Sequence, residues 1–187
     1  MTNRDRLLES TRALLWERGY IGTSPAAIQA LAKVGQGSMY HHFDGKRGLA
    51  GEALATTAQD MRLRAEATLE RPGPALDRIV TYLRVEREAL RGCPVGRMAL
   101  DPDVVADDAL RRPVEEYFSW LTERLRQLLE EAHGAGQIAP HLVPEDVSSA
   151  VVATIQGGYV LARALQDPRA MSTAIEGIIA LLTGWEG

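Results

Sequence analysis

The sequence contains little cysteine, few aromatic residues and no long apolar run. The single cysteine, Cys93, excludes a framework of internal disulfides and is typical of a reducing cytoplasm. Polar residues interrupt every apolar run well before membrane-spanning length, and no basic start is followed by an apolar stretch. Aromatic residues make up only 5%, but hydrophobic residues reach 45% of 187 residues, enough for a sizeable core. We therefore expect a cytoplasmic protein without a secretory signal.

Catalytic and metal-binding motifs are also missing. The sequence has no G-x-S-x-G, P-loop or H-E-x-x-H pattern. Acidic pairs such as Asp107-Asp108 are sequential neighbours on solvated faces and give no basis for acid–base catalysis. His41 and His42 are adjacent, so on a helix they diverge by roughly 100° and converge poorly on one ion. The other two histidines lack companion ligands at metal-binding spacing. We expect no enzyme activity, no cofactor and no metal.

Charge is unevenly distributed along the chain. The formal charge of the whole sequence is −4, which by itself does not suggest a protein that binds nucleic acid. Residues 1–50 contain seven Lys or Arg against four Asp or Glu, a charge of +3. Residues 51–187 contain fourteen Lys or Arg and twenty-one Asp or Glu, which gives a charge of −7. A basic head on an acidic body is the asymmetry expected when only the head contacts phosphate.

The segment 23–46 has the pattern of two short helices around a turn. Ser24-Pro25 is a helix-start signal, because the hydroxyl can accept an N–H that has no helical partner and Pro fits the first helical position. An alanine-rich helix with one apolar side follows. Gly35 then lies where a left-handed turn residue would let the chain reverse.

The second short helix is predicted over about 36–42. Met39 and Phe43 are four residues apart and share one face. The polar side chains left to project outward are Gln36, Ser38, Tyr40 and His41. Two short helices joined by a tight turn form a helix-turn-helix, whose second helix enters the major groove of DNA.

These residues resemble the N-terminal domain of the tetracycline-repressor (TetR) family. The resemblance covers about the first 50 residues and rests on many spacings that agree at once: Gly19-Tyr20, Thr23-Ser24, Ile28, Leu31-Ala32, Val34-Gly35, Gly37-Ser38, Tyr40, Phe43, Lys46 and Leu49. It implies an all-helical homodimer that binds a palindromic operator and releases it when a small molecule enters the C-terminal domain. By position it implies phosphate contacts from Ser24, Tyr40 and Lys46. It also implies that residues at or near base edges are Gln36, Gly37, Ser38 and His41. Pro25 departs from the family, which more often has an aliphatic residue there.

Apolar residues at helical spacing predict further helices. In chain order these cover 4–18, from 47 to about 70, 75–91, one ending near 133, 145–165 and 169–185. In helix 75–91 the apolar stripe includes Leu90, and Arg87 on the same stripe would snorkel or pair inside. The turn-rich Gly92–Gly96 (GCPVG), followed by a short apolar helix, resembles the LmrA/YxaF-like branch of the family. The acidic segment 101–108 is expected to be partly irregular.

The two closing helices carry an excess of apolar surface. Helix 145–165 has Val151, Ile155 and Leu161 on one stripe and further apolar residues on another face, so it needs two partners. Gly157 and Gly158 lie in mid-helix, where each costs about 0.8–1.0 kcal/mol relative to Ala unless another helix or a ligand approaches closely. The apolar stripe of the last helix comprises Met171, Ile175, Ile178, Leu182 and Trp185. The pattern predicts a homodimer joined by a symmetric four-helix interface.

Large or polar side chains beside the main stripes form a candidate effector pocket. They are Tyr82, Met98, Tyr117, Trp120, Gln156 and Tyr159, and ordinary core packing is the alternative for each. Walls of Met and aromatic residues suit an apolar or amphipathic small molecule. Cys93 lies near Arg91 and Arg97, which would make its thiolate more reactive, so it is a candidate redox sensor. A buried apolar role is the commoner alternative for this cysteine.

The sequence thus predicts an all-α protein with two domains. Residues 1–46 form a helix-turn-helix DNA-binding domain, and residues 47–187 form a helical ligand-binding and dimerisation domain. The expected function is a transcriptional regulator, most simply a repressor released from its operator by a small molecule. The alternative from another class is a helical small-molecule-binding protein or enzyme without specific DNA binding. The basic head and its polar helix argue against this alternative.

Overall fold

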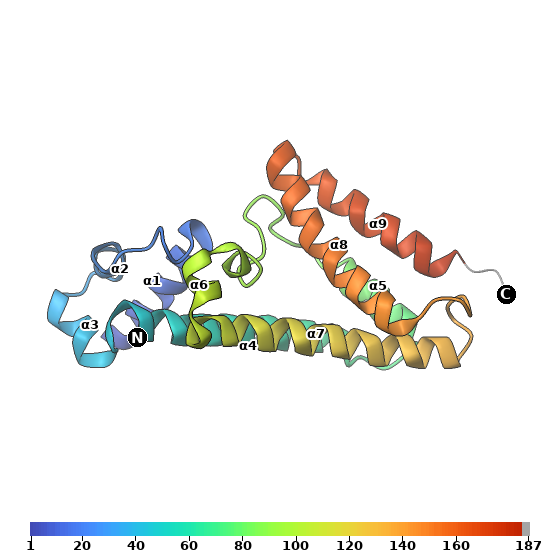
Figure 1. Cartoon of the computed structure of the whole chain (residues 1–187), viewed down its shortest axis with the longest axis horizontal. Helices are drawn as coiled ribbons and strands as arrows, with labels where there is room; N and C mark the ends of the chain where they lie inside the picture. The colour runs from blue at the N-terminus through green and yellow to red at the C-terminus, as the bar shows by residue number, and fades with distance from the viewer. Residues whose placement is uncertain (185–187) are drawn as a thin grey trace. The chain divides into compact units, whose positions relative to one another are not determined.

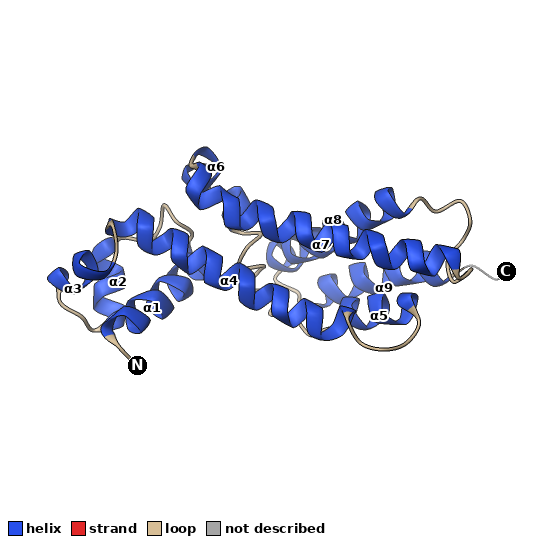
Figure 2. Ribbon diagram, turned by 90° about the horizontal axis from the view of Figure 1, so that it is seen from below, coloured by secondary structure: helices blue, strands red, loops and turns tan. Residues whose placement is uncertain are grey.

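The structure is a computed structural model that describes residues 1–184 and, at Gln36, the backbone only. Within these residues the secondary structure consists of helices joined by turns and loops, with no strand (Figure 1, Figure 2). The elements in chain order are α1 (Asn3–Arg18), α2 (Pro25–Ala32), α3 (Gln36–His42), α4 (Gly45–Leu69), α5 (Ala75–Leu83), η1 (Met98–Leu100), α6 (Pro102–Ala106), α7 (Asp108–Gly134), α8 (Pro144–Leu165) and α9 (Arg169–Thr183). The predicted fold class is confirmed. No helix within the described residues is long and apolar enough to cross a membrane.

The described chain divides into two compact units. The first comprises residues 1–61 and 93–117, and the second comprises residues 62–92 and the chain from Phe118 onward. Each unit therefore contains segments from two parts of the sequence. The predicted boundary after Lys46 falls at the start of α4, inside the first unit, and stays a prediction about how function is divided.

The first three helices enclose a core of their own. Helix α1 begins with a capping box, in which the Thr2 hydroxyl accepts the N–H of Asp5 and the Asp5 carboxylate accepts the N–H of Thr2. It ends at Gly19, whose φ of 77° is left-handed and whose N–H donates to the Leu15 carbonyl. The buried cluster between these helices and the start of α4 consists of Leu7, Leu14, Ile28, Ala32, Met39, Phe43 and Leu49. The predicted burial of Met39 and Phe43 on one face is confirmed.

The turn between α2 and α3 differs from the prediction. Gly35 has φ −70° and ψ 158°, so it is the extended residue that precedes α3 and not the left-handed residue of the turn. Lys33 takes the left-handed conformation instead, with φ 54° and ψ 47°, directly after the last residue of α2. The Val34 N–H donates to the Gln29 carbonyl at 3.1 Å, which closes the helix end. The reversal occurs two residues earlier than predicted because the residue directly after a helix end adopts the left-handed form.

Helix α5 is shorter than predicted, since it ends at Leu83 and not at Arg91. The guanidinium of Arg87 donates to the carbonyls of Tyr82 at 2.9 Å, Leu83 at 2.7 Å and Val85 at 2.6 Å. These bonds satisfy the carbonyls that a longer helix would have paired internally. Leu90 is consequently 45% exposed and does not belong to a buried stripe. Of the two roles expected for Arg87, the structure shows pairing, but from a half-buried position beyond the end of α5.

Helices α8 and α9 form an antiparallel hairpin within the second unit (Figure 1). A Cβ built on Gly158 would lie 2.3 Å from the Met171 sulfur, so α9 approaches α8 closely at this glycine, as predicted. A Cβ on Gly157 would meet nothing within 4 Å. One detail of the predicted stripes is wrong: Ile179, not Ile178, is the buried residue of α9. Leu161 of α8 is 48% exposed, so α9 does not cover it, and its burial against a second partner stays a prediction. The predicted role of Trp185 lies outside the described residues.

Candidate nucleic-acid interface

The described side chains of α3 are divided between a buried face and an exposed surface. Tyr40 is 58% exposed, while Met39 beside it is fully buried. Gly37 and His41 are exposed, and Ser38 is half-buried. A Cβ on Gly37 would meet nothing within 4 Å, so the backbone there is open to a close approach. The predicted base-edge residues Gly37, Ser38 and His41 therefore lie on one short helix supported by a packed core. The side chain of Gln36 lies outside what the structure describes.

Ser24 caps the helix that precedes this surface. Its hydroxyl oxygen accepts the Ala27 N–H at 3.1 Å, as the Ser-Pro signal predicted. Ser24 is exposed, and its own hydroxyl proton remains available to donate to an external acceptor. The geometry is thus compatible with both the cap and the predicted phosphate contact.

Lys46 is more enclosed than its predicted phosphate role suggested. Its ammonium lies 3.8 Å from the centroid of the Tyr20 ring, within the range of a cation–π contact. Burial lowers the pKa of Lys46, and attraction to the carboxylates of Asp101 and Asp103 opposes that shift. In this conformation the ammonium is held by groups of the protein.

Asp101, which is not among the predicted site residues, is only 8% exposed. Its Oδ2 accepts the N–H groups of Tyr20 at 2.8 Å and Ile21 at 3.0 Å, in the turn between α1 and α2. Its Oδ1 accepts the Asp103 N–H at 3.2 Å and caps α6. Asp101-Pro102 is the same kind of helix-start signal as Ser24-Pro25. The expectation of a partly irregular acidic segment is therefore wrong for residues 102–106, which form α6 behind this signal.

Arg47 and Asp107 form a second connection that the sequence did not reveal. The Arg47 guanidinium donates to both carboxylate oxygens of Asp107, Nε at 2.5 Å and Nη2 at 2.8 Å. The guanidinium holds the pKa of Asp107 at about 2. The segment 101–107 therefore contacts the head at the α1–α2 turn and at the first turn of α4. No three His, Cys, Asp or Glu side chains of the described part of the chain could hold a metal ion together.

The predicted effector residues are distributed over both units. Met98 and Tyr117 are buried in the first unit. The remaining four belong to the second unit: Tyr82, Trp120, Gln156 and Tyr159. Tyr82 is buried, and the Arg87 guanidinium lies 5.3 Å from the centroid of its ring. The Arg62 guanidinium lies 4.8 Å from the centroid of the Trp120 ring. Their assignment to an effector site stays a prediction.

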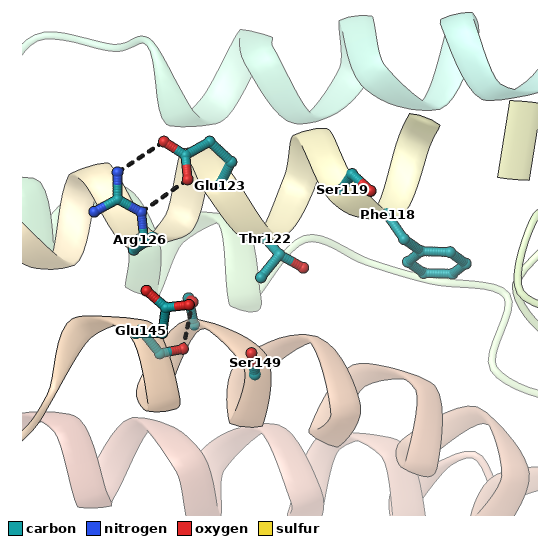
Figure 3. Close-up of a pocket in the computed structure, with 8 residues that line it drawn as sticks. Phe118, Ser119, Thr122, Glu123, Arg126, Glu145 and Ser149 are labelled. Carbon is teal, nitrogen blue, oxygen red and sulfur yellow. Dashed lines mark hydrogen bonds and ion pairs between the residues drawn. The ribbon is translucent and has the colours of Figure 1, made fainter. Parts of the chain in front are cut away.

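A pocket of about 370 Å³ lies between α7 and the start of α8 in the second unit (Figure 3). Its walls are formed by Phe118, Ser119, Thr122, Glu123, Arg126, Glu145, Ser148 and Ser149. None of the six predicted effector residues lines it. The Arg126 guanidinium donates two hydrogen bonds of 2.8 Å to Glu123, so the charge on its α7 wall is internally paired.

Cys93 is buried, with 4% of its surface exposed. Its sulfur accepts the Gly96 N–H at 3.2 Å within the turn that follows. This contact is compatible with a packed thiol and with a stabilised thiolate. The redox-sensor role of Cys93 stays a prediction.

The fold and the surface of α3 together define a helix-turn-helix transcriptional regulator. Comparison with known proteins gives the same class and a narrower group. The family profile described as "Bacterial regulatory proteins, tetR family" matches residues 7–53, and "Tetracyclin repressor-like, C-terminal domain" matches residues 68–178. The chain belongs to the TetR family. The LmrA/YxaF-like branch stays a prediction.

Individual relatives cover nearly the whole chain. The HTH-type transcriptional repressor DhaR of Mycobacterium sp. (strain GP1) is 27% identical over 160 residues, which cover 84% of this chain and 80% of DhaR. A TetR-family regulator from Agrobacterium tumefaciens has the same fold, with a TM-score of 0.89 and 19% identity over 97% of both chains. A TetR regulator from Chloroflexus aurantiacus has a TM-score of 0.83 and 27% identity, over 95% of this chain and 92% of that chain.

Proposed function

We propose that this TetR-family regulator is a repressor that binds a palindromic operator as a homodimer and releases it when a small molecule binds. The observation that carries this proposal is the polar surface of α3, exposed on helices that have a dedicated core. A recognition helix needs a rigid support and free side chains, because base contacts require side chains held in register with the groove. The name of the relative DhaR, a repressor, supports the direction of regulation.

Side chains of the head divide into two roles. Ser24, Tyr40 and Lys46 hold backbone phosphates and fix the position of the head on DNA. Donor and acceptor groups that suit base edges come from Gln36, Gly37, Ser38 and His41. Lys46 reaches phosphate by leaving the Tyr20 ring, which costs about 0.5–2 kcal/mol, the range of a cation–π contact.

The second apolar face of α8 supports a homodimer through the two C-terminal helices. Val160, Leu161 and Leu165 of α8 are 58%, 48% and 66% exposed, and Leu181 of α9 is 74% exposed. Gly157 adds an open position on α8 where another helix can approach. Two copies of this hairpin would bury these residues in a four-helix interface. A dimer places two heads on successive major-groove faces, with half-site centres about 34–36 Å apart or a multiple of this spacing.

The effector is an apolar or amphipathic small molecule bound in the helical body. The predicted lining combines adaptable and aromatic walls with few polar anchors: Tyr82, Met98, Tyr117, Trp120, Gln156 and Tyr159. A ligand that favours a body conformation with misplaced heads shifts the population away from the operator-bound form. A protein that regulates genes in this way acts in the compartment that holds the DNA, which we expect to be the cytoplasm.

The test is selection of bound sequences from a pool of randomised duplex DNA at two salt concentrations. We expect an enriched palindrome whose affinity falls as salt rises, since phosphate contacts release counterions. The selected operator then serves to screen small molecules for release of the DNA. Recovery of no enriched sequence at either salt concentration would contradict the proposed function.

A further inference from the structure

The first turn of α4 faces an acidic segment of its own chain. Residues 101–108 contain four aspartates and no basic residue. Asp107 binds Arg47 through both carboxylate oxygens, and Asp101 and Asp103 attract the Lys46 ammonium. The two cations that begin α4 are therefore both engaged by the same segment. DNA phosphates must compete with these carboxylates for the same charges.

Asp107 is fixed in place by contacts other than the one with Arg47. Its Oδ1 accepts the N–H groups of Ala109 at 2.9 Å and Leu110 at 3.4 Å, and so caps the start of α7. The Asp107 side chain is 24% exposed, whereas that of Arg47 is 59% exposed. Arg47 is thus the more solvent-exposed partner of the pair. To bind anything else, its guanidinium has to leave Asp107.

Asp101 holds the other end of the segment against the head. Its carboxylate accepts the N–H groups of Tyr20 and Ile21, so the segment stays anchored to the α1–α2 turn. The competing acid is therefore part of the folded unit that contains the recognition helix, and its effective concentration at Arg47 is high.

We propose that Arg47 is a further phosphate-binding residue and that Asp107 is an intramolecular competitor that withholds it from DNA. A carboxylate and a phosphate both accept the planar fork of a guanidinium in a bidentate manner, so one can replace the other. The Asp107–Arg47 contact lowers the affinity of the head for any duplex. A shift of the segment 101–107 away from α4 raises that affinity. This inference rests on the proposed binding of DNA by α3 and the start of α4.

The test compares the wild-type protein with Asp107→Asn. The side-chain carbonyl oxygen of asparagine preserves the cap of α7, because Asn is as good an N-cap as Asp. The substitution does remove the negative charge that Asp107 presents to Arg47. The probe is a short labelled duplex of mixed sequence, titrated at several salt concentrations. We expect Asp107→Asn to bind about threefold to fivefold more tightly than wild type. We also expect the slope of log affinity against log salt concentration to become more negative by about 0.9 for each head that gains a phosphate contact.

Asp108→Asn is the matched control. It removes the same charge one residue away, from a side chain that is 88% exposed and pairs with Arg111, not Arg47. We expect its affinity to stay close to that of wild type. The double variant Arg47→Ala/Asp107→Asn completes a cycle with Arg47→Ala, and we expect no gain from Asp107→Asn once Arg47 is absent.

Three outcomes would count against these ideas in different ways. If Asp107→Asn binds no more tightly than Asp108→Asn, the competition between Asp107 and phosphate is wrong. If the gain persists without Arg47, the effect is one of net charge and the role of Arg47 is wrong. If the wild-type protein binds no duplex at any salt concentration, the proposed function fails and this inference fails with it. Thermal melting of each variant checks that the fold is unchanged.

Discussion

The carboxylate of Asp101 accepts the backbone N–H of Tyr20 at 2.8 Å, across 81 positions of the sequence. The same oxygen accepts the Ile21 N–H, and the other oxygen caps α6. One buried side chain therefore connects the turn before the helix-turn-helix with the segment 101–107. This connection makes Asp101 a positioning residue for the head.

Replacement of Asp101 by Ala should destabilise the first unit. The substitution removes the two carboxylate oxygens that accept three N–H groups, and leaving a buried polar group unsatisfied costs about 1–3 kcal/mol. We expect the free energy of unfolding to fall by about that amount in urea denaturation followed by circular dichroism. Asp103→Ala changes an exposed residue of the same helix and should stay within about 0.5 kcal/mol of wild type. Equal stability of Asp101→Ala and Asp103→Ala would contradict the positioning role.

Tyr40→Phe tests the phosphate contact on α3. Tyr40 is 58% exposed, so loss of its hydroxyl should leave the melting temperature unchanged. We expect weaker binding to all duplexes, about threefold to tenfold, because a lost phosphate contact carries no sequence information. Gln36→Ala should instead change the selected base preference. If Tyr40→Phe binds every sequence as wild type does, the phosphate role of this hydroxyl is wrong.

The two adjacent glycines of α8 should respond in opposite directions to alanine. In Gly158→Ala the new Cβ would lie 2.3 Å from the Met171 sulfur, so the buried Met171 must move. We expect a loss of about 1–3 kcal/mol, the typical cost of overpacking. Gly157→Ala meets nothing within the chain and should gain up to about 1 kcal/mol of helix stability under conditions that keep the protein monomeric. Similar thermal stabilities of the two variants would show that α8 and α9 are not closely packed at Gly158.

A charge on the exposed apolar face of α8 and α9 should disrupt the proposed homodimer. Leu181 is 74% exposed, and Leu161 on α8 is 48% exposed. We expect Leu181→Glu and Leu161→Glu to weaken dimerisation at least tenfold, measured by sedimentation, because each buries a charge without a partner. Leu100→Glu is the control, since Leu100 is equally apolar and 79% exposed but belongs to the first unit. Dimerisation of Leu181→Glu at the wild-type concentration would remove α9 from the proposed interface.

The Asp107–Arg47 pair predicts an acid titration. Arg47 and the N–H groups of Ala109 and Leu110 lower the pKa of Asp107 from 3.8 to about 2. A carboxyl group with a lower pKa in the folded protein stabilises the fold above its unfolded pKa. This contribution is lost as the pH falls from about 3.8 to about 2. In Arg47→Ala, carboxyl-carbon NMR should show the pKa of Asp107 rising partway toward 3.8, because the two N–H bonds remain. The guanidinium of Arg111 does not touch Asp107, so Arg111→Ala should leave the pKa of Asp107 unchanged. An equal rise of this pKa in both variants would contradict the assigned cause.

Much of the local structure was determined by short-range signals in the sequence. The Ser24 cap, the end of α1 at Gly19 and the burial of Met39 and Phe43 all follow from residues within a few positions of each other. Such features depend on capping, backbone conformation and helical periodicity, which a sequence displays directly. The same spacings sufficed to predict the helix-turn-helix and its family.

Tertiary structure decided the features that depend on distant partners. Helix α5 ends early because Arg87 folds back onto its carbonyls, and periodicity gives no sign of this. Asp107 engages Arg47 across 60 positions of the chain, and Asp101 reaches Tyr20 across 81. In the sequence, neither aspartate can be distinguished from an ordinary acidic residue on a solvent-exposed face. Only the fold brings it to a particular N–H group or guanidinium, because the position of a charge in space depends on how all the intervening helices pack.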